Sequence, residues 1–347
     1  MKEINTIYTL FSSVVVLEKL HICTWDVKGQ KAFIEVGMQL DANIPEGGLS
    51  AYVYLPFIND STIVSSLHQE LSDEANFRFI FNRSHSNKTL IGGDNRNGSI
   101  FTIDKDVKGD EAPQSEDIAI LNVDATIDEH KFVKFNFTRP NGNVSKLYGR
   151  VLLKTTHETL ANTVSGITKK DYLYDIKINE VRNMPDVVFD YKRNKNLFLC
   201  NPDTVILLHA IPEEWNINYS DSSRLKNVRR LEMDAFKHYM NWIEKVSDEY
   251  LITFSKADAK GGTSFFTSFT KEHVGSKQLF VAVIMNILCS LLFAFSQINY
   301  PDPAHPDICV LKVVPISYYV AIGIFIIGLL YVFNIHQIVW RFIKNRL

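Results

Sequence analysis

Cysteine is scarce in this chain of 347 residues, which contains only four of them. They are widely spaced, at Cys23, Cys200, Cys289 and Cys309, and no C-x-x-C pair occurs. This spacing suggests neither a disulfide framework nor a zinc site built on paired thiolates. Such cysteine usage fits a protein of a reducing compartment.

An excess of charge of either sign is also lacking, because the formal net charge is only -2. A protein that binds nucleic acid over a broad surface usually shows a basic excess. The composition gives no support to that class of function. Any recognition of an anion must therefore depend on a local cluster of cations.

Motifs of known catalytic chemistry are missing as well. The sequence has no G-x-S-x-G, Walker lysine loop, H-E-x-x-H, kinase set or deaminase zinc signature. Asp104, Asp106 and Gly109 imitate the start of a calcium loop, but Lys108 and Ser115 stand where oxygen ligands are needed. We therefore expect no metal and no cofactor, and we favour a role other than catalysis.

The first 23 residues make a poor secretory signal, because they lack a basic start and their apolar patch is followed by Glu18 and Lys19. Seven Asn-x-Ser/Thr triplets would suit a glycosylated protein, but a chain rich in Asn, Ser and Thr produces such triplets by composition. We expect the large N-terminal part of the chain to be cytoplasmic.

What the sequence does contain is two long apolar runs near its end, Leu279 to Phe295 and Ile316 to Phe333, with no charged residue in either. A bilayer core about 30 Å thick needs roughly 20 apolar residues in a helix, and each run with its flanks reaches that length. Two buried core helices are the alternative. The prolines between the runs, at 301, 303, 306 and 315, predict a helical hairpin.

The orientation of the hairpin follows from lysine and arginine near the membrane ends. The loop between the runs has only Lys312, whereas the outer flanks carry Lys271, Lys277, Arg341, Lys344 and Arg346. We predict a two-pass protein of the inner (plasma) membrane with both termini in the cytoplasm.

Small and polar residues recur every fourth position in the first run, at Ala282, Asn286 and Ser290. This spacing places them on one face of a helix, where small residues allow close helix approach and an amide seeks a partner. We predict a membrane association face, which either joins copies of the chain or packs the hairpin against itself.

The part before the runs is mainly β in pattern. The expected strands are 20–28, 31–40, 50–58, 77–81, 99–103, 172–181, 187–191, 196–200, 204–211 and 251–254. A helix is expected over 60–71, and alternating runs on both sides of Asn141-Gly142 predict a β-hairpin. The fold class is α+β, a predominantly β cytoplasmic domain followed by a C-terminal two-helix transmembrane hairpin.

Four segments are expected along the chain. Residues 1–155 form a β-rich subdomain, and residues 156–256 an α+β subdomain with a long amphipathic helix. Residues 257–277 link this part to the membrane, and residues 278–347 form the hairpin and a short basic tail.

That amphipathic helix is predicted over Ser223 to Val246, where apolar residues recur at spacings of three and four. Its first turns carry the one local cluster of cations: Arg224, Lys226, Arg229 and Arg230. A helix N-terminus attracts anions, so the cluster is a candidate site for a phospholipid head group or a nucleotide phosphate. The alternative is a solvated helix face whose cations pair with nearby acidic residues.

The layout, a cytoplasmic domain joined to a two-helix hairpin, resembles membrane effectors of bacterial antiviral defence, in which a sensor domain triggers membrane disruption. This resemblance implies a sensor or interaction domain whose partners are the lipid bilayer, an anionic or nucleotide ligand, and further copies of the chain or another protein. A membrane-tethered enzyme acting on lipid or nucleic acid is one alternative. A passive membrane-anchoring subunit is another.

Overall fold

The computed structural model describes most of the chain before residue 273 and a few residues beyond it. The described residues are 6–26, 32–58, 62–94, 96–104, 115–128, 130–154, 161–166, 169–221, 223–231, 233–240, 250–258, 262–272, 281–290, 319, 322–323 and 325–326.

The described part is predominantly β with few helices, as the sequence predicts. The strands are β1 (Thr6–Phe11), β2 (Leu17–Trp25), β3 (Phe33–Asp41), β4 (Leu49–Tyr54), β5 (Ile63–Ser66), β6 (His85–Leu90), β7 (Gly98–Asp104), β8 (Ser115–Leu121), β9 (Asp124–Ile127), β10 (Phe132–Phe137), β11 (Lys146–Lys154), β12 (Asn162–Ser165), β13 (Lys169–Ile178), β14 (Phe198–Leu199), β15 (Thr204–Pro212), β16 (Trp215–Ser220), β17 (Leu225–Arg230), β18 (Tyr250–Asp258) and β19 (Thr263–Glu272). The helices are α1 (His68–Leu71), α2 (Glu74–Phe81), α4 (Asp186–Asn194) and α5 (Met233–Tyr239), with 3-10 turns η1 (Ile91–Gly93) and η2 (Val181–Asn183).

The strands form two mixed sheets. The nine-stranded sheet follows the order β16-β19-β13-β1-β4-β10-β9, with β12 paired to β13 and β14 paired to β1. The ten-stranded sheet follows the order β17-β18-β15-β2-β3-β11-β8-β7-β6, with β5 paired to β11. Strand β15 lies between β2 and β18, so its apolar sequence is in the interior of its sheet. Strands from both sides of residue 155, where we expect a subdomain boundary, are neighbours in both sheets.

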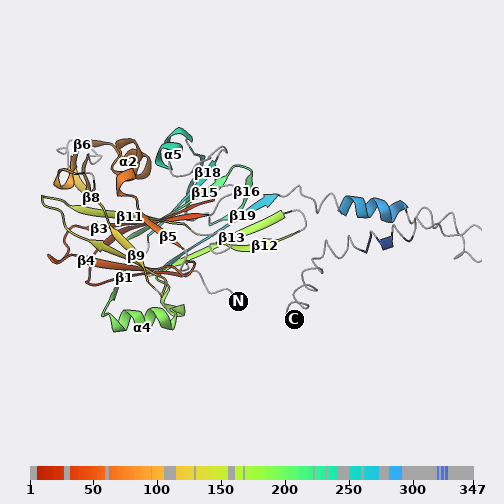
Figure 1. Ribbon diagram of the computed structural model, residues 1–347, viewed down its shortest axis with the longest axis horizontal. Helices are drawn as coiled ribbons and strands as arrows, with labels where there is room; N and C mark the ends of the chain where they lie inside the picture. The colour runs from red at the N-terminus through yellow and green to blue at the C-terminus, as the bar shows by residue number, and fades with distance from the viewer. Residues whose placement is uncertain are drawn as a thin grey trace, which may run out of the picture. The chain divides into compact units, whose positions relative to one another are not determined.

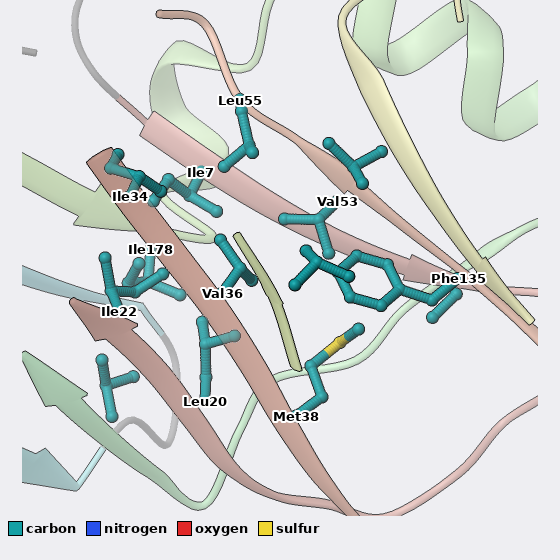
Figure 2. Packing of buried hydrophobic residues seen from close by; sticks show 14 of the residues in the cluster. Ile7, Leu20, Ile22, Ile34, Val36, Met38, Val53, Leu55, Phe135 and Ile178 are labelled. Atoms are coloured by element: carbon teal, nitrogen blue, oxygen red, sulfur yellow. The ribbon is translucent and has the colours of Figure 1, made fainter. Parts of the chain in front are cut away.

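The main core lies between the two sheets (Figure 2). Ile34, Val36 and Met38 of β3 point from the ten-stranded sheet towards Val53 and Phe135 of the other sheet, and all five are buried. Their alternation along β3 follows the two-residue period of a strand. Each large apolar side chain buried in this way contributes about 1.5–3 kcal/mol to stability.

Helices cover the outer faces of both sheets in Figure 1, where α2 and α5 lie beside one sheet and α4 beside the other. Leu71 of α1, Phe77 of α2 and Tyr239 of α5 belong to the cluster on the ten-stranded sheet. Val188 and Tyr191 of α4 pack on the nine-stranded sheet. The central strands of the ten-stranded sheet are therefore buried on both faces.

The strand predicted at 77–81 is wrong, because these residues belong to helix α2. Asp73 caps this helix: its carboxylate accepts from the backbone N–H groups of Ala75 at 2.9 Å and Asn76 at 3.1 Å. A side-chain cap of this kind is worth about 1 kcal/mol and overrides the β propensity of the phenylalanines.

The strand predicted at 187–191 is also wrong, since these residues lie in α4. Pro185 precedes this helix, Asp186 occupies its first turn and Lys192 and Arg193 its last, an arrangement that suits the helix dipole. In the helix predicted over 60–71, only the last turn is helical, because Ile63–Ser66 pair with β11 as strand β5.

The predicted β-hairpin around Asn141-Gly142 is wrong, although both of its strands exist. Strand β10 pairs with β4 and β9, whereas β11 pairs with β3, β5 and β8 of the other sheet. Phe135 of β10 and Val151 of β11 are both buried in the core between the sheets. The turn therefore carries the chain across the core from one sheet to the other.

The long helix predicted over 223–246 is wrong as well. Leu225–Arg230 form strand β17, which pairs with β18, and α5 covers only Met233–Tyr239. The apolar residues Leu225, Val228 and Leu231 have a helical spacing. However, pairing with β17 satisfies the backbone N–H and C=O groups of β18, which would otherwise lie unpaired at the edge of the sheet. Residues 241–249 lie outside the described residues.

The expected linker over 257–277 contains strand β19 of the nine-stranded sheet. Within the first apolar run, residues 281–290 are helical. Most of the predicted hairpin lies outside the described residues. In the part of the chain that the structure describes, no helix combines the length and apolarity needed to cross a membrane.

We predict that Gly98→Ala destabilises the domain by about 1–3 kcal/mol, because Gly98 has a φ of +111° and an added Cβ would lie 1.9 Å from the carbonyl oxygen of Ile120. Gly47→Ala is the control, since nothing lies within 4 Å of its added Cβ. Urea unfolding of both variants checks this expectation. Equal stability of the two would contradict it.

Candidate functional site: a basic cavity on the ten-stranded sheet

A cavity of about 440 Å³ lies on the outer face of the ten-stranded sheet, against the end of α2 and strand β17. This volume falls within the range of small-molecule sites. Its lining residues come from the sheet, from α2 and the residues after it, and from β17: Lys19, His21, Trp25, Gln39, Phe79, Ile80, Phe81, Asn82, Arg83, Ile118, Arg150, Ile206, Leu208, Lys226, Asn227, Arg229, Ile252 and Phe254.

The charged lining of the cavity is entirely basic. It consists of Lys19, Arg83, Arg150, Lys226 and Arg229, and no aspartate or glutamate is among the described lining residues. No ion pair with a described residue is formed by Lys19, Lys226 or Arg229. Arg83 Nη1 lies 3.8 Å from Glu116 Oε2, and the Arg83 side chain is 45% exposed. A chain of net charge -2 thus concentrates unpaired positive charge at one hollow.

Strand alternation places polar residues on this face. On β2, Lys19 and His21 alternate with the core residues Leu20 and Ile22. Arg150 of β11 follows the same rule, since it lies between positions that face the other sheet. The polar floor of the cavity is therefore built from three central strands, β2, β3 and β11, rather than from loops.

Arg150 is fully buried and forms an ion pair with Glu35, which is also buried. Its Nε donates to Glu35 Oε2 at 2.6 Å. The other oxygen, Oε1, accepts from Trp25 Nε1 at 2.8 Å, and Tyr239 Oη donates to Oε2 at 2.9 Å. These bonds join β2, β3, β11 and α5 beneath the cavity, and they compensate the charge of Arg150.

Two basic groups of the floor are perturbed by their surroundings. Burial lowers the pKa of Lys19, and the neighbouring Arg83 lowers it further. Burial also lowers the pKa of His21 well below its ordinary value, with contributions from Arg150 and Lys19. An anion in the cavity would offset the charges of Lys19, Arg83 and Arg150.

Of the four cations predicted as an anion site, the structure brings two into the cavity. Lys226 and Arg229 line it, whereas Arg224 pairs with Asp221 and Arg230 with Glu213. A bulge between Leu225 and Asn227 breaks the alternation of β17. Because of this bulge, the consecutive residues Lys226 and Asn227 both reach the cavity.

The predicted membrane association face lies on the described helix over 281–290. Ala282, Asn286 and Ser290 are exposed there, and the Ser290 hydroxyl donates to the backbone carbonyl of Asn286 at 2.8 Å.

The sequence reasoning missed Lys19, His21, Gln39, Arg83 and Arg150. A signal for four of them exists, because each interrupts an otherwise apolar strand at alternate positions. A strand that is apolar on one face and mixes charge with aromatic residues on the other suggests a buried polar site. Arg83 has no such signal, since only the position of α2 brings it to the cavity.

Other polar clusters offer less. His209 is buried, and its Nδ1 lies 2.5 Å from Thr24 Oγ1. Burial raises the pKa of Cys23 to about 12, so this thiol is a poor nucleophile. Among the described residues, no group of three or more His, Cys, Asp or Glu side chains could hold a metal ion.

No protein-family model matches this sequence, and no curated protein matches it. Among solved structures, the chain is similar to an M1 zinc metallopeptidase from Deinococcus radiodurans. The alignment has 8% sequence identity and a TM-score of 0.27, and covers 73% of this chain and 42% of that chain. A likeness of this degree supports no statement about fold or activity.

We predict that Glu35→Gln costs roughly 3–5 kcal/mol of stability, because it leaves the charge of Arg150 buried without its counterion. The matched variant Glu35→Leu with Arg150→Met removes both charges and is expected to be less destabilised than Glu35→Gln alone. Guanidinium unfolding of the three proteins measures the difference. A loss below 1 kcal/mol for Glu35→Gln would show that Arg150 does not depend on this carboxylate.

Proposed function

We propose that the β domain is a sensor that binds an anionic small molecule in the basic cavity, and that the C-terminal apolar runs hold this sensor at a membrane. The observation that carries the proposal is the lining of the cavity, with five cations and no described acid. Phosphate and carboxylate groups form charge-assisted hydrogen bonds with such side chains. Affinity should therefore fall as the salt concentration rises.

The lining favours binding over catalysis. No carboxylate, hydroxyl or thiol side chain is among the described lining residues, so a nucleophile of these classes is absent from that set. The polar groups are instead cations, amides, the His21 imidazole and the Trp25 indole, which suit the binding of a ligand. A membrane-tethered enzyme acting on lipid or nucleic acid is the alternative, and it would need a reactive group beyond those that line the cavity.

The path of the chain offers a way to couple the cavity to the membrane. Ile252 and Phe254 of β18 line the cavity, and the next strand, β19, ends at Glu272. The first apolar run begins at Leu279, a few residues later. In this proposal, ligand binding at β17 and β18 alters how the runs associate through Ala282, Asn286 and Ser290. A passive anchor would bind the same ligand without such a response.

The cavity test uses inorganic tripolyphosphate as the anion and isothermal calorimetry of the detergent-purified chain. We expect Lys226→Ala with Arg229→Ala to weaken binding at least about tenfold, because charge-assisted hydrogen bonds are lost. Arg230→Ala is the matched control on the same strand, since Arg230 pairs with Glu213 and does not line the cavity. Equal losses in both variants would place the anion elsewhere.

The membrane test uses Asn286→Leu, with Met285→Leu as the control at the adjacent, exposed position of the same helix. An amide in hydrocarbon seeks a partner across a helix interface, at about 0.6–2 kcal/mol per contact. We expect Asn286→Leu to reduce oligomer size in detergent and dye leakage from vesicles, with unchanged insertion. Full leakage with an unchanged oligomer would support the passive anchor.

A further inference from the structure

Two polar atoms in the residues that form the cavity floor have no hydrogen-bond partner among the residues that the structure describes. They are Nε2 of His21 and Oε1 of Gln39, in side chains that are 6% and 3% exposed. Both residues line the cavity. A buried polar atom without a hydrogen bond is costly, so a ligand that reaches these atoms and pairs with them gains affinity.

The neighbour of Gln39 decides which of its amide atoms is free. The side-chain nitrogen of Gln39 lies 2.8 Å from Glu18 Oε2. An ionised carboxylate only accepts hydrogen bonds, so the atom that faces Glu18 must be the amide nitrogen. The free atom is therefore the carbonyl oxygen, which is an acceptor.

The neighbours of His21 decide its tautomer. Arg150 Nη1 donates to the Tyr148 hydroxyl oxygen at 3.2 Å, and His21 Nδ1 lies 2.9 Å from the same oxygen. The buried Tyr148 hydroxyl accepts from Arg150, so we assign its own proton to the hydrogen bond with His21 Nδ1. Because Nδ1 is then the acceptor, the neutral ring carries its hydrogen on Nε2. The free atom of His21 is then a donor.

The strand register places the two residues that carry this acceptor and donor close to each other. Lys19 of β2 lies opposite Gln39 of β3, and His21 lies opposite Gly37. Gln39 and His21 are thus diagonal neighbours on one face of the sheet. Gly37 has a role of its own, because a Cβ at this position would lie 2.3 Å from the Tyr148 hydroxyl that orients His21.

The remaining walls suit a flat ring. Phe79 and Phe81 of α2, Trp25 of β2 and Phe254 of β18 line the same cavity. Aromatic side chains stack on any nucleic-acid base, as they do in proteins that bind single-stranded nucleic acids without sequence preference. The cavity therefore combines cations, aromatic side chains, and one donor and one acceptor on neighbouring strands.

We propose that the ligand is a nucleotide, whose phosphates meet Lys226 and Arg229 and whose base pairs its edge with His21 Nε2–H and Gln39 Oε1. This inference rests on the proposed function, because it assigns the second half of the same ligand. On its Watson–Crick edge, each of the four bases presents an acceptor next to a donor. An inorganic polyphosphate or a phosphatidate head group has no such edge.

The test compares tripolyphosphate with ATP, GTP, CTP and UTP by calorimetry on the detergent-purified full chain. At least one nucleotide is expected to bind about tenfold or more tightly than tripolyphosphate. Gln39→Met and His21→Phe are each expected to remove this advantage and to leave tripolyphosphate affinity unchanged, which also shows that the cavity is folded. His209→Phe is the control, since it removes a buried histidine that does not line the cavity.

Three outcomes would overturn the inference. Nucleotides that bind no more tightly than tripolyphosphate, or an advantage that survives both floor variants, would leave only the anion site. Binding to phosphatidate vesicles with none to free nucleotides would replace the base by a lipid. Failure of tripolyphosphate and all four nucleotides to bind would instead overturn the proposed function itself.

Discussion

The buried ion pair between Glu35 and Arg150 is the interaction on which the outer face of the ten-stranded sheet depends. Two charges taken out of water are costly unless every remaining donor and acceptor is satisfied. Here Trp25 and Tyr239 bind the carboxylate, and Tyr148 and the Cys23 sulfur accept from the guanidinium. The pair therefore organises side chains from three strands and one helix into a single polar network.

This network explains how a sheet covered on both faces can hold a polar cavity. Central strands of such a sheet are usually apolar throughout. In β2, β3 and β11 the inward positions are apolar. The outward positions instead mix apolar residues such as Phe33 and Leu152 with a hydrogen-bonded network bordered by Lys19, His21 and Gln39. Local rules of burial are broken most often at functional sites, because a ligand or a bound charge supplies the compensation.

The basic rim depends on a different feature, the bulge in β17. A regular strand would send Lys226 and Asn227 to opposite faces. The extra residue lets both reach the cavity, while Arg224 and Arg230 remain paired with Asp221 and Glu213. The sequence does not distinguish these four cations from one another. The pairing of β17 with β18 places two of them at the cavity and leaves the other two in ion pairs.

The sequence by itself determined the predominantly β character of the domain and most of its strands, because a two-residue alternation is a local property that survives any choice of partner. It also grouped Arg224, Lys226, Arg229 and Arg230 as a candidate anion site, of which Lys226 and Arg229 line the cavity. Only the tertiary structure decided that β10 and β11 belong to different sheets and that residues 225–230 form a strand. Both outcomes depend on pairing with strands that lie elsewhere in the chain. The floor of the cavity could not be predicted from local pattern either. His21 and Gln39 lie on the consecutive strands β2 and β3, but Arg150 comes from β11, far along the chain, and hydrogen bonds between residues distant in sequence set their roles.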